Sequence, residues 1–151
     1  MNYRNLLAVA AMAASPIAAQ TAPDAPLSTK SGIIGAPVAG KGQVVFFRPG
    51  TIMGVAMGCT VHEGGAEVAR LGSGKYYAVA AEPGKHVFST NGEAKDELRL
   101  EVEAGETYFV KCSIGAGIMG GRANLSPSDR ASFAAKSKGY KMWDTKEQSG
   151  K

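Results

Sequence analysis

The sequence predicts a mainly β protein, an antiparallel β-sandwich of about seven or eight short strands with one short C-terminal helix. Glycine is abundant, at 20 of 151 residues, which is roughly double the usual share of about 7%. The apolar runs are short, and turn signals such as Glu63-Gly64-Gly65 and Asn91-Gly92 close them. One short helix cannot cover such a sheet, so a second sheet must form the other layer. A small barrel is the alternative.

The chain begins with a segment typical of a secretory signal peptide, which we place at residues 1–19. Arg4 precedes an unbroken apolar run over residues 6–14, and a proline and small residues follow up to Ala19. The run has about half of the roughly 20 residues that a transmembrane helix needs. We therefore expect export, cleavage near Ala19, a periplasmic or secreted location, and no transmembrane helix in the mature chain.

The remaining chain is expected to form one domain between two irregular ends. Residues 20–41 contain three prolines among Ala, Ser, Thr and Gly, and predict a flexible linker. The β-sandwich domain is expected over residues 42–137. Its candidate strands are short apolar runs ended by turn residues, namely 43–47, 56–62, 67–71, 76–81, 86–90, 97–103 and 107–114, with an eighth near 118–125.

Alternating side chains assign the faces of two strands. Within residues 97–103 apolar and charged residues alternate, which predicts one buried and one solvent-facing side. By the same period Tyr108, Val110 and Cys112 share a face, so Cys112 is expected to point into the core. Two cysteines in an exported chain favour a disulfide between Cys59 and Cys112, provided that their Cα atoms lie within about 7 Å. The alternative is two separate buried thiols.

The C-terminal part is expected to hold the helix and a loose basic tail. Ser126-Pro127 matches an N-cap and a first helical position, and residues 129–136 can form about two turns. Residues 138–151 are expected to be the tail. Residues 20–125 carry as many acidic as basic side chains, so the positive excess of the mature chain lies beyond them. Its bases alternate with acids and glycines, which favours a solubilising end over a binding surface.

Four segments occur in an order that resembles a bacterial family of unknown function, domain-of-unknown-function family 2846. The segments are Phe46-Phe47-Arg48-Pro49, Leu71-Gly72-Ser73-Gly74-Lys75-Tyr76-Tyr77, Glu82-Pro83-Gly84-Lys85-His86, and Glu103-Ala104-Gly105-Glu106-Thr107-Tyr108-Phe109-Val110. The resemblance covers roughly residues 42–125. It implies an exported, compact β-sandwich and supplies no catalytic residues. Many members of the family are lipoproteins, but this chain has no acceptor cysteine beside the leader's apolar run.

The residues that catalysis would need are sparse. His62 and His86 lie on different candidate strands, and neither a serine elbow nor a His-Glu-x-x-His helix is present. A cysteine nucleophile would have to be Cys59 or Cys112, and an apolar strand interior makes a thiol inert. We therefore expect no enzymatic activity, no catalytic residues and no cofactor.

A copper site is the second interpretation. Four methionines, together with Cys59 and the two histidines, could supply soft ligands for cuprous copper; they are Met53, Met57, Met119 and Met142. Their spacing is poor for a metal cluster, and methionine as a gap-filler of the core is the simpler interpretation. No metal site is therefore assigned.

A repeated Ile-Met-Gly marks the candidate partner-binding residues Ile52, Met53, Ile118 and Met119. If both glycine-rich connections emerge at one end of the sandwich, these side chains suit a partner protein or lipid surface. The alternative is that both methionines close the core. No pattern favours nucleic acid. The leading hypothesis is an exported, non-enzymatic binding or structural module of the bacterial cell envelope, with a periplasmic metal-handling (copper-binding) protein second and a hydrolase third.

Overall fold

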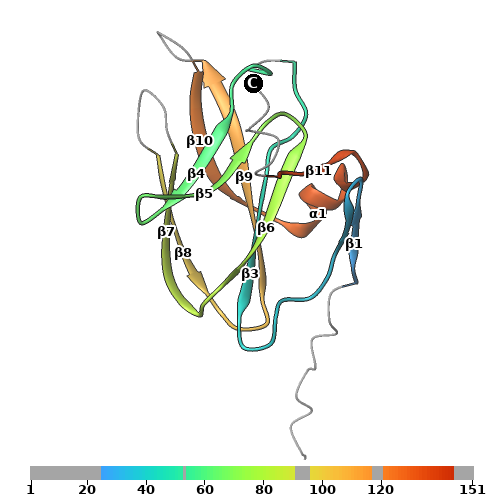
Figure 1. The fold of residues 1–151 in the computed structure, drawn as a ribbon, viewed down its shortest axis with the longest axis vertical. Coiled ribbons are helices and arrows are strands. Elements are labelled where there is room, and N and C mark those ends of the chain that lie inside the picture. The colour runs from blue at the N-terminus through green and yellow to red at the C-terminus, as the bar shows by residue number, and fades with distance from the viewer. Residues whose placement is uncertain (1–24, 53, 91–95, 117–120, 145–151) are drawn as a thin grey trace, which may run out of the picture.

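Two β-sheets pack face to face in the computed structural model (Figure 1). The structure describes residues 25–52, 54–90, 96–116 and 121–144. The predicted signal peptide lies outside these residues. Within them, no helix has the length and apolar character needed to cross a bilayer.

The larger sheet has five strands in the order β10-β9-β3-β6-β11. Its central strand β3 pairs antiparallel with β6 and parallel with β9, and β11 adds a second parallel pair with β6. The strands are β3 (Gly42–Phe47), β6 (Lys75–Ala81), β9 (Thr107–Ala116), β10 (Gly121–Ser128) and β11 (Lys141–Met142).

The smaller sheet has four strands in the order β5-β4-β7-β8, and all its pairs are antiparallel. They are β4 (Cys59–Glu63), β5 (Ala66–Leu71), β7 (Gly84–Thr90) and β8 (Glu97–Val102). The tight β4–β5 turn uses Gly64 and Gly65, whose φ angles of 56° and 84° are readily adopted by glycine. The predicted mainly β sandwich is confirmed, although two of its strand pairs are parallel.

The main core lies between the two sheets. Phe46 of β3 meets Phe88 of β7 edge to face, with ring centroids 4.9 Å apart. Val110 and Cys112 of β9 point into this core, as their alternation predicts. Cys112 forms a disulfide with Cys59 of β4, and their Cα atoms are 6.5 Å apart. The predicted bridge therefore joins one sheet to the other.

A second apolar cluster covers the outer face of the five-stranded sheet. Val45, Phe47 and Phe109 project from that face toward Phe133, which is completely buried and belongs to helix α1 (Arg130–Ala134). The Phe47 and Phe133 rings lie 5.3 Å apart. Other parts of this cluster come from both ends of the described chain, and they are Leu27, Ile34 and Tyr140.

Parts of the predicted linker and of the predicted loose tail are ordered. The middle of the predicted linker forms a hairpin of β1 (Leu27–Thr29) and β2 (Gly32–Ile34). The hairpin is ordered because Leu27 and Ile34 bury their side chains in the second cluster. The 3₁₀ turn η1 (Ser137–Gly139) and β11 replace the start of the tail, where Trp143 packs on Tyr77 at 5.2 Å.

The predicted start of the helix is also wrong. Ser126 and Pro127 belong to β10, and Asp129 is the N-cap because its carboxylate accepts a 2.7 Å hydrogen bond from the Ser132 N–H. Pro127 is compatible with a strand here because β10 is an edge strand, where a missing N–H costs no ladder bond.

The disulfide yields the first prediction. Its cysteines are 53 residues apart, so replacing both by alanine should lower the free energy of unfolding by about 4 kcal/mol, measured by urea denaturation. Reduced wild-type protein is the control, because it loses the bridge and keeps both side chains. Two alkylatable thiols in unreduced, denatured protein would show that the bridge is absent.

Candidate functional site

The glycine-rich connection from β3 to β4 lies against the end of β9 and the start of β10. Gly54 of this β3–β4 connection has φ 65°, and a Cβ there would lie 3.0 Å from Cγ2 of Ile114 on β9. A Cβ at Gly121 of β10 would collide with Met57. We call this surface, formed by the described residues of 48–58, 112–116 and 121–124, the loop end.

Arg48 holds the β3–β4 connection from the inside. It follows β3 on the core-facing side and is 2% exposed. Its guanidinium donates to the carbonyl oxygens of Gly54 and Met57 in the connection, and to that of Leu71 at 3.3 Å. Burial lowers the pKa of Arg48, yet a guanidinium remains cationic in proteins. No described carboxylate lies within ion-pair distance of it.

A serine fixes the same connection from the other side. The Ser73 hydroxyl accepts a 3.0 Å hydrogen bond from the Thr51 N–H and donates one of 3.2 Å to the Thr51 carbonyl. The Met57 N–H donates to the Gly54 carbonyl at 3.0 Å. Backbone groups on both sides of Ile52 therefore have partners within the protein.

Two aliphatic side chains of this connection point outward. Ile52 is 96% exposed and Val55 is 62% exposed, both large fractions for aliphatic residues. Of the predicted partner-binding residues, Ile52 thus lies on the surface at the loop end. Met53, Ile118 and Met119 lie outside the described residues.

A pocket of about 480 Å³ opens beside Ile52. It lies where β9 extends beyond the end of β3, because β3 pairs with β9 only as far as Lys111 whereas β9 continues to Ala116. Its volume is within the range of about 300–1,000 Å³ of small-molecule sites. The lining combines aliphatic, hydroxyl and cationic side chains, including Pro49, Ile52, Ile114, Ser113 and Lys111.

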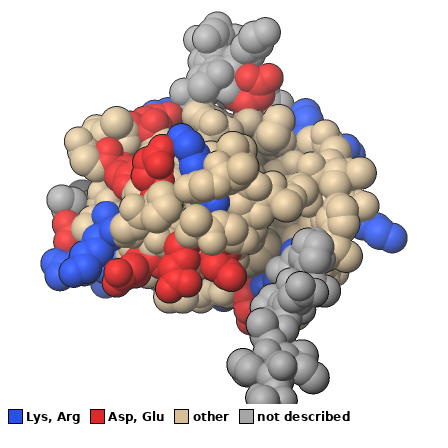
Figure 2. Space-filling model, turned by 90° about the horizontal axis from the view of Figure 1, so that it is seen from below, with Lys and Arg blue, Asp and Glu red and all other residues tan. Residues whose placement is uncertain are grey.

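The charges of the described residues separate between the two ends of the sandwich. Basic side chains at or just below the loop end are Arg48, Arg70, Lys75, Lys111, Arg122 and Lys141, against the acidic Glu67, Asp96, Glu97 and Asp144. The opposite end, formed by the start of β3 and the β6–β7 and β8–β9 turns, is mainly acidic. Figure 2 looks onto that end and shows its carboxylates; Glu82, Glu101, Glu103 and Glu106 belong to it, with Lys41 and Lys85.

His86 lies near the acidic end and bonds two acceptors. Its Nδ1 lies 2.5 Å from Oε1 of Glu63, and its Nε2 lies 2.7 Å from the carbonyl oxygen of Glu82. Only the imidazolium has an N–H for both contacts. The Glu82 carbonyl, and then the Glu63 carboxylate, raise the pKa of His86 against the opposing effect of burial. His86 therefore links β7 to β4 and to the β6–β7 turn, a structural role.

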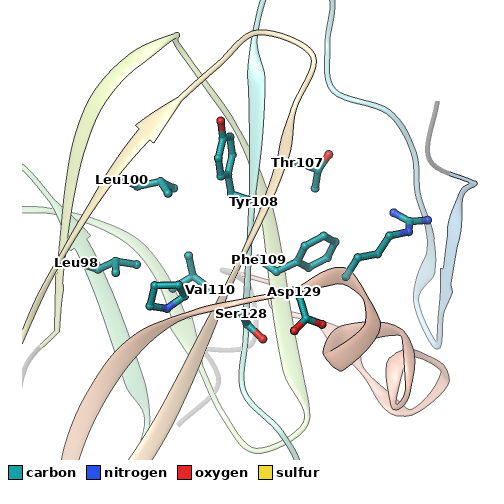
Figure 3. A pocket seen from close by; sticks show the side chains of 10 residues that line it. Leu98, Leu100, Thr107, Tyr108, Phe109, Val110, Ser128 and Asp129 are labelled. Carbon is teal, nitrogen blue, oxygen red and sulfur yellow. The ribbon is translucent and has the colours of Figure 1, made fainter. Parts of the chain in front are cut away.

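A smaller pocket of about 190 Å³ opens at the side of the sandwich, between β8 and β9. Figure 3 shows Leu98 and Leu100 of β8 on one side of it, with Tyr108 and Val110 of β9 beside them. The two charged residues that line it have structural roles. Asp129 caps α1, and the Arg130 guanidinium donates a hydrogen bond to the Ala25 carbonyl. This pocket is a weaker candidate for ligand binding than the loop end.

The cysteines proposed for soft-metal or nucleophilic chemistry are joined to each other. The disulfide withdraws Cys59 from the copper ligand set and leaves neither cysteine as a thiolate. Among the described residues, no group of three or more His, Cys, Asp or Glu side chains is arranged to hold a metal ion.

Fold and site together define a small β-sandwich with a disulfide between its sheets and an apolar, basic loop end. The model of a family of proteins of unknown function, DUF2846, matches residues 38–123. The chain belongs to this family, as the four segments indicated. The match includes both main sheets except for most of β10 and all of β11, and it leaves out the β1–β2 hairpin and α1. No curated protein and no solved structure matches the chain.

Arg48 was not predicted as a site residue, and its contacts give a second prediction. Replacing Arg48 by Met removes the guanidinium donor from three carbonyls, although that of Gly54 keeps the Met57 N–H as a donor. The free energy of unfolding should therefore fall by about 3 kcal/mol, and the amide of Met57 should exchange faster. Arg48→Lys is the matched variant, because it keeps the charge and lacks the planar fork that reaches several carbonyls. Arg48→Lys should lower the free energy of unfolding by an intermediate amount. An Arg48→Met protein as stable as wild type would show that the guanidinium does not organise the connection.

A third prediction concerns pH. Because folding raises the pKa of His86, its protonated form stabilises the fold fully below about pH 6.5, and that stabilisation is lost as the pH rises through the folded-state value. The stability difference between wild type and His86→Gln, from urea denaturation, should therefore shrink from pH 5.5 to 8.5. When both proteins also carry Glu63→Gln, the stability difference between them should change less with pH. A constant difference across this range would contradict the assignment.

Proposed function

We propose that this protein is an exported, non-enzymatic binding module of the cell envelope, and that its loop end contacts another envelope component. The observation that carries the proposal is the 96% exposure of Ile52 on a connection that Arg48 and Ser73 hold from within. A loop already fixed in its bound shape loses little conformational entropy when it binds. Exposed aliphatic side chains on such a loop gain free energy when a partner covers them.

Two observations support export. The first 19 residues have the charged, apolar and small-residue parts of a signal peptide. The Cys59–Cys112 disulfide suits a compartment outside the reducing cytoplasm.

Export is tested by fractionating cells and sequencing the amino terminus of the product. We expect a mature chain that starts near Gln20 and leaves the cell or enters the periplasm. A cytoplasmic product that keeps Met1 would refute this part of the proposal.

Binding by the loop end is tested by photocrosslinking in intact cells. A photoreactive amino acid in place of Ile52 should form adducts with protein or lipid. The same residue in place of Val38 is the control, because Val38 is 61% exposed and precedes β3 at the other end of the sandwich. Equal crosslinking from the two positions would mean that the loop end has no special role.

A further inference from the structure

Building on the proposed function, we infer that the loop end docks on the surface of an anionic lipid bilayer, with Ile52 and Val55 inserted at the boundary between headgroups and acyl chains. The lipid surface is then the envelope component that the loop end contacts. Three features of the described residues support it.

The first feature is the shape of the apolar surface. Ile52 and Val55 project from a connection between strands and are 96% and 62% exposed. Protein partners usually cover apolar surface within a broad patch of well-packed residues. Isolated aliphatic side chains on a projecting loop instead suit insertion into a soft, apolar phase to the shallow depth typical of interfacial anchors.

The second feature is the internal bonding of the same loop. A backbone group that enters an apolar phase loses its hydrogen bonds to water, which is costly unless the protein replaces them. Here Arg48 bonds the carbonyls of Gly54 and Met57, and Ser73 bonds both backbone groups of Thr51. The loop can therefore approach the acyl chains with these backbone groups satisfied.

The third feature is the separation of charge. Residues 20–125 are balanced in formal charge, yet more basic than acidic side chains lie toward the loop end. Acidic side chains gather at the opposite end, which Figure 2 shows. Arg122 is exposed and Lys111 is partly exposed near the apolar tip. Each basic residue near an anionic membrane surface contributes attraction, while the acidic end is repelled. The same field that attracts the protein thus turns Ile52 toward the lipid.

The test uses flotation of the full mature protein with vesicles of phosphatidylglycerol and phosphatidylethanolamine, and with vesicles of phosphatidylcholine alone. We expect binding to the anionic vesicles that weakens as salt is added, and little binding to phosphatidylcholine. Ile52→Ser should weaken binding by about tenfold or more, since it removes one buried aliphatic side chain. Arg122→Gln should weaken it by about fivefold.

Matched variants are taken from the other end of the molecule. Val38→Ser removes an equally aliphatic exposed side chain and Lys85→Gln an exposed charge, and neither should weaken binding. All four positions are on the surface, so the melting temperatures should stay close to wild type. Equal losses in Ile52→Ser and Val38→Ser would overturn the assigned orientation.

The outcomes separate this inference from the proposed function. Absence of binding to anionic vesicles, combined with protein adducts from position 52 in cells, would overturn lipid docking and retain a binding module with a protein partner. Absence of both vesicle binding and position-specific adducts would overturn both. Lipid adducts from position 52 together with salt-sensitive vesicle binding would support both.

Discussion

The burial of β3 on both faces is the constraint on which the rest of the structure depends. The side chains of Val44, Val45, Phe46 and Phe47 are each at most 1% exposed. Val44 and Phe46 point between the sheets, whereas Val45 and Phe47 point away from the second sheet. A sandwich covers only the first pair. The outer face needs its own cover, which the β1–β2 hairpin and α1 supply by burying Leu27 and Phe133.

The same strand also determines where the loop end begins. Pro49 has no N–H with which to continue the ladder, and pairing with β9 stops at Phe47 and Lys111. Arg48 then lies on the inward side of the chain, at the rim of the core, where a charge requires hydrogen-bond acceptors. The carbonyls of Gly54, Met57 and Leu71 meet this requirement. Burial of one cation thus defines the path of the connection that carries Ile52.

Sequence periodicity predicted the inner core well and the outer layer poorly. The alternation around Cys112 gave the correct face for the disulfide, although only three-dimensional structure could place Cys59 within reach. The outer layer is built from isolated apolar residues such as Leu27 and Tyr140 among glycines, prolines and charges, so no period marks them. The unbroken run at Val44–Phe47 was the available signal, because such runs are typical of strands covered on both sides. Likewise, Arg48 directly after that run was the signal for a buried cation that bonds the β3–β4 connection.

The parallel pairing of β3 with β9 has a consequence for the time course of folding. Val45 must meet Phe109, and the chain between them forms the whole second sheet and β6. A chain that emerges from a ribosome with its amino terminus first can pair β3 with β6 but lacks the β3–β9 pairing until β9 has appeared. The disulfide waits for the same segment, since Cys112 lies on β9. Contacts of such long sequence separation form slowly, so the five-stranded sheet is completed late, after the strands of the second sheet have been made.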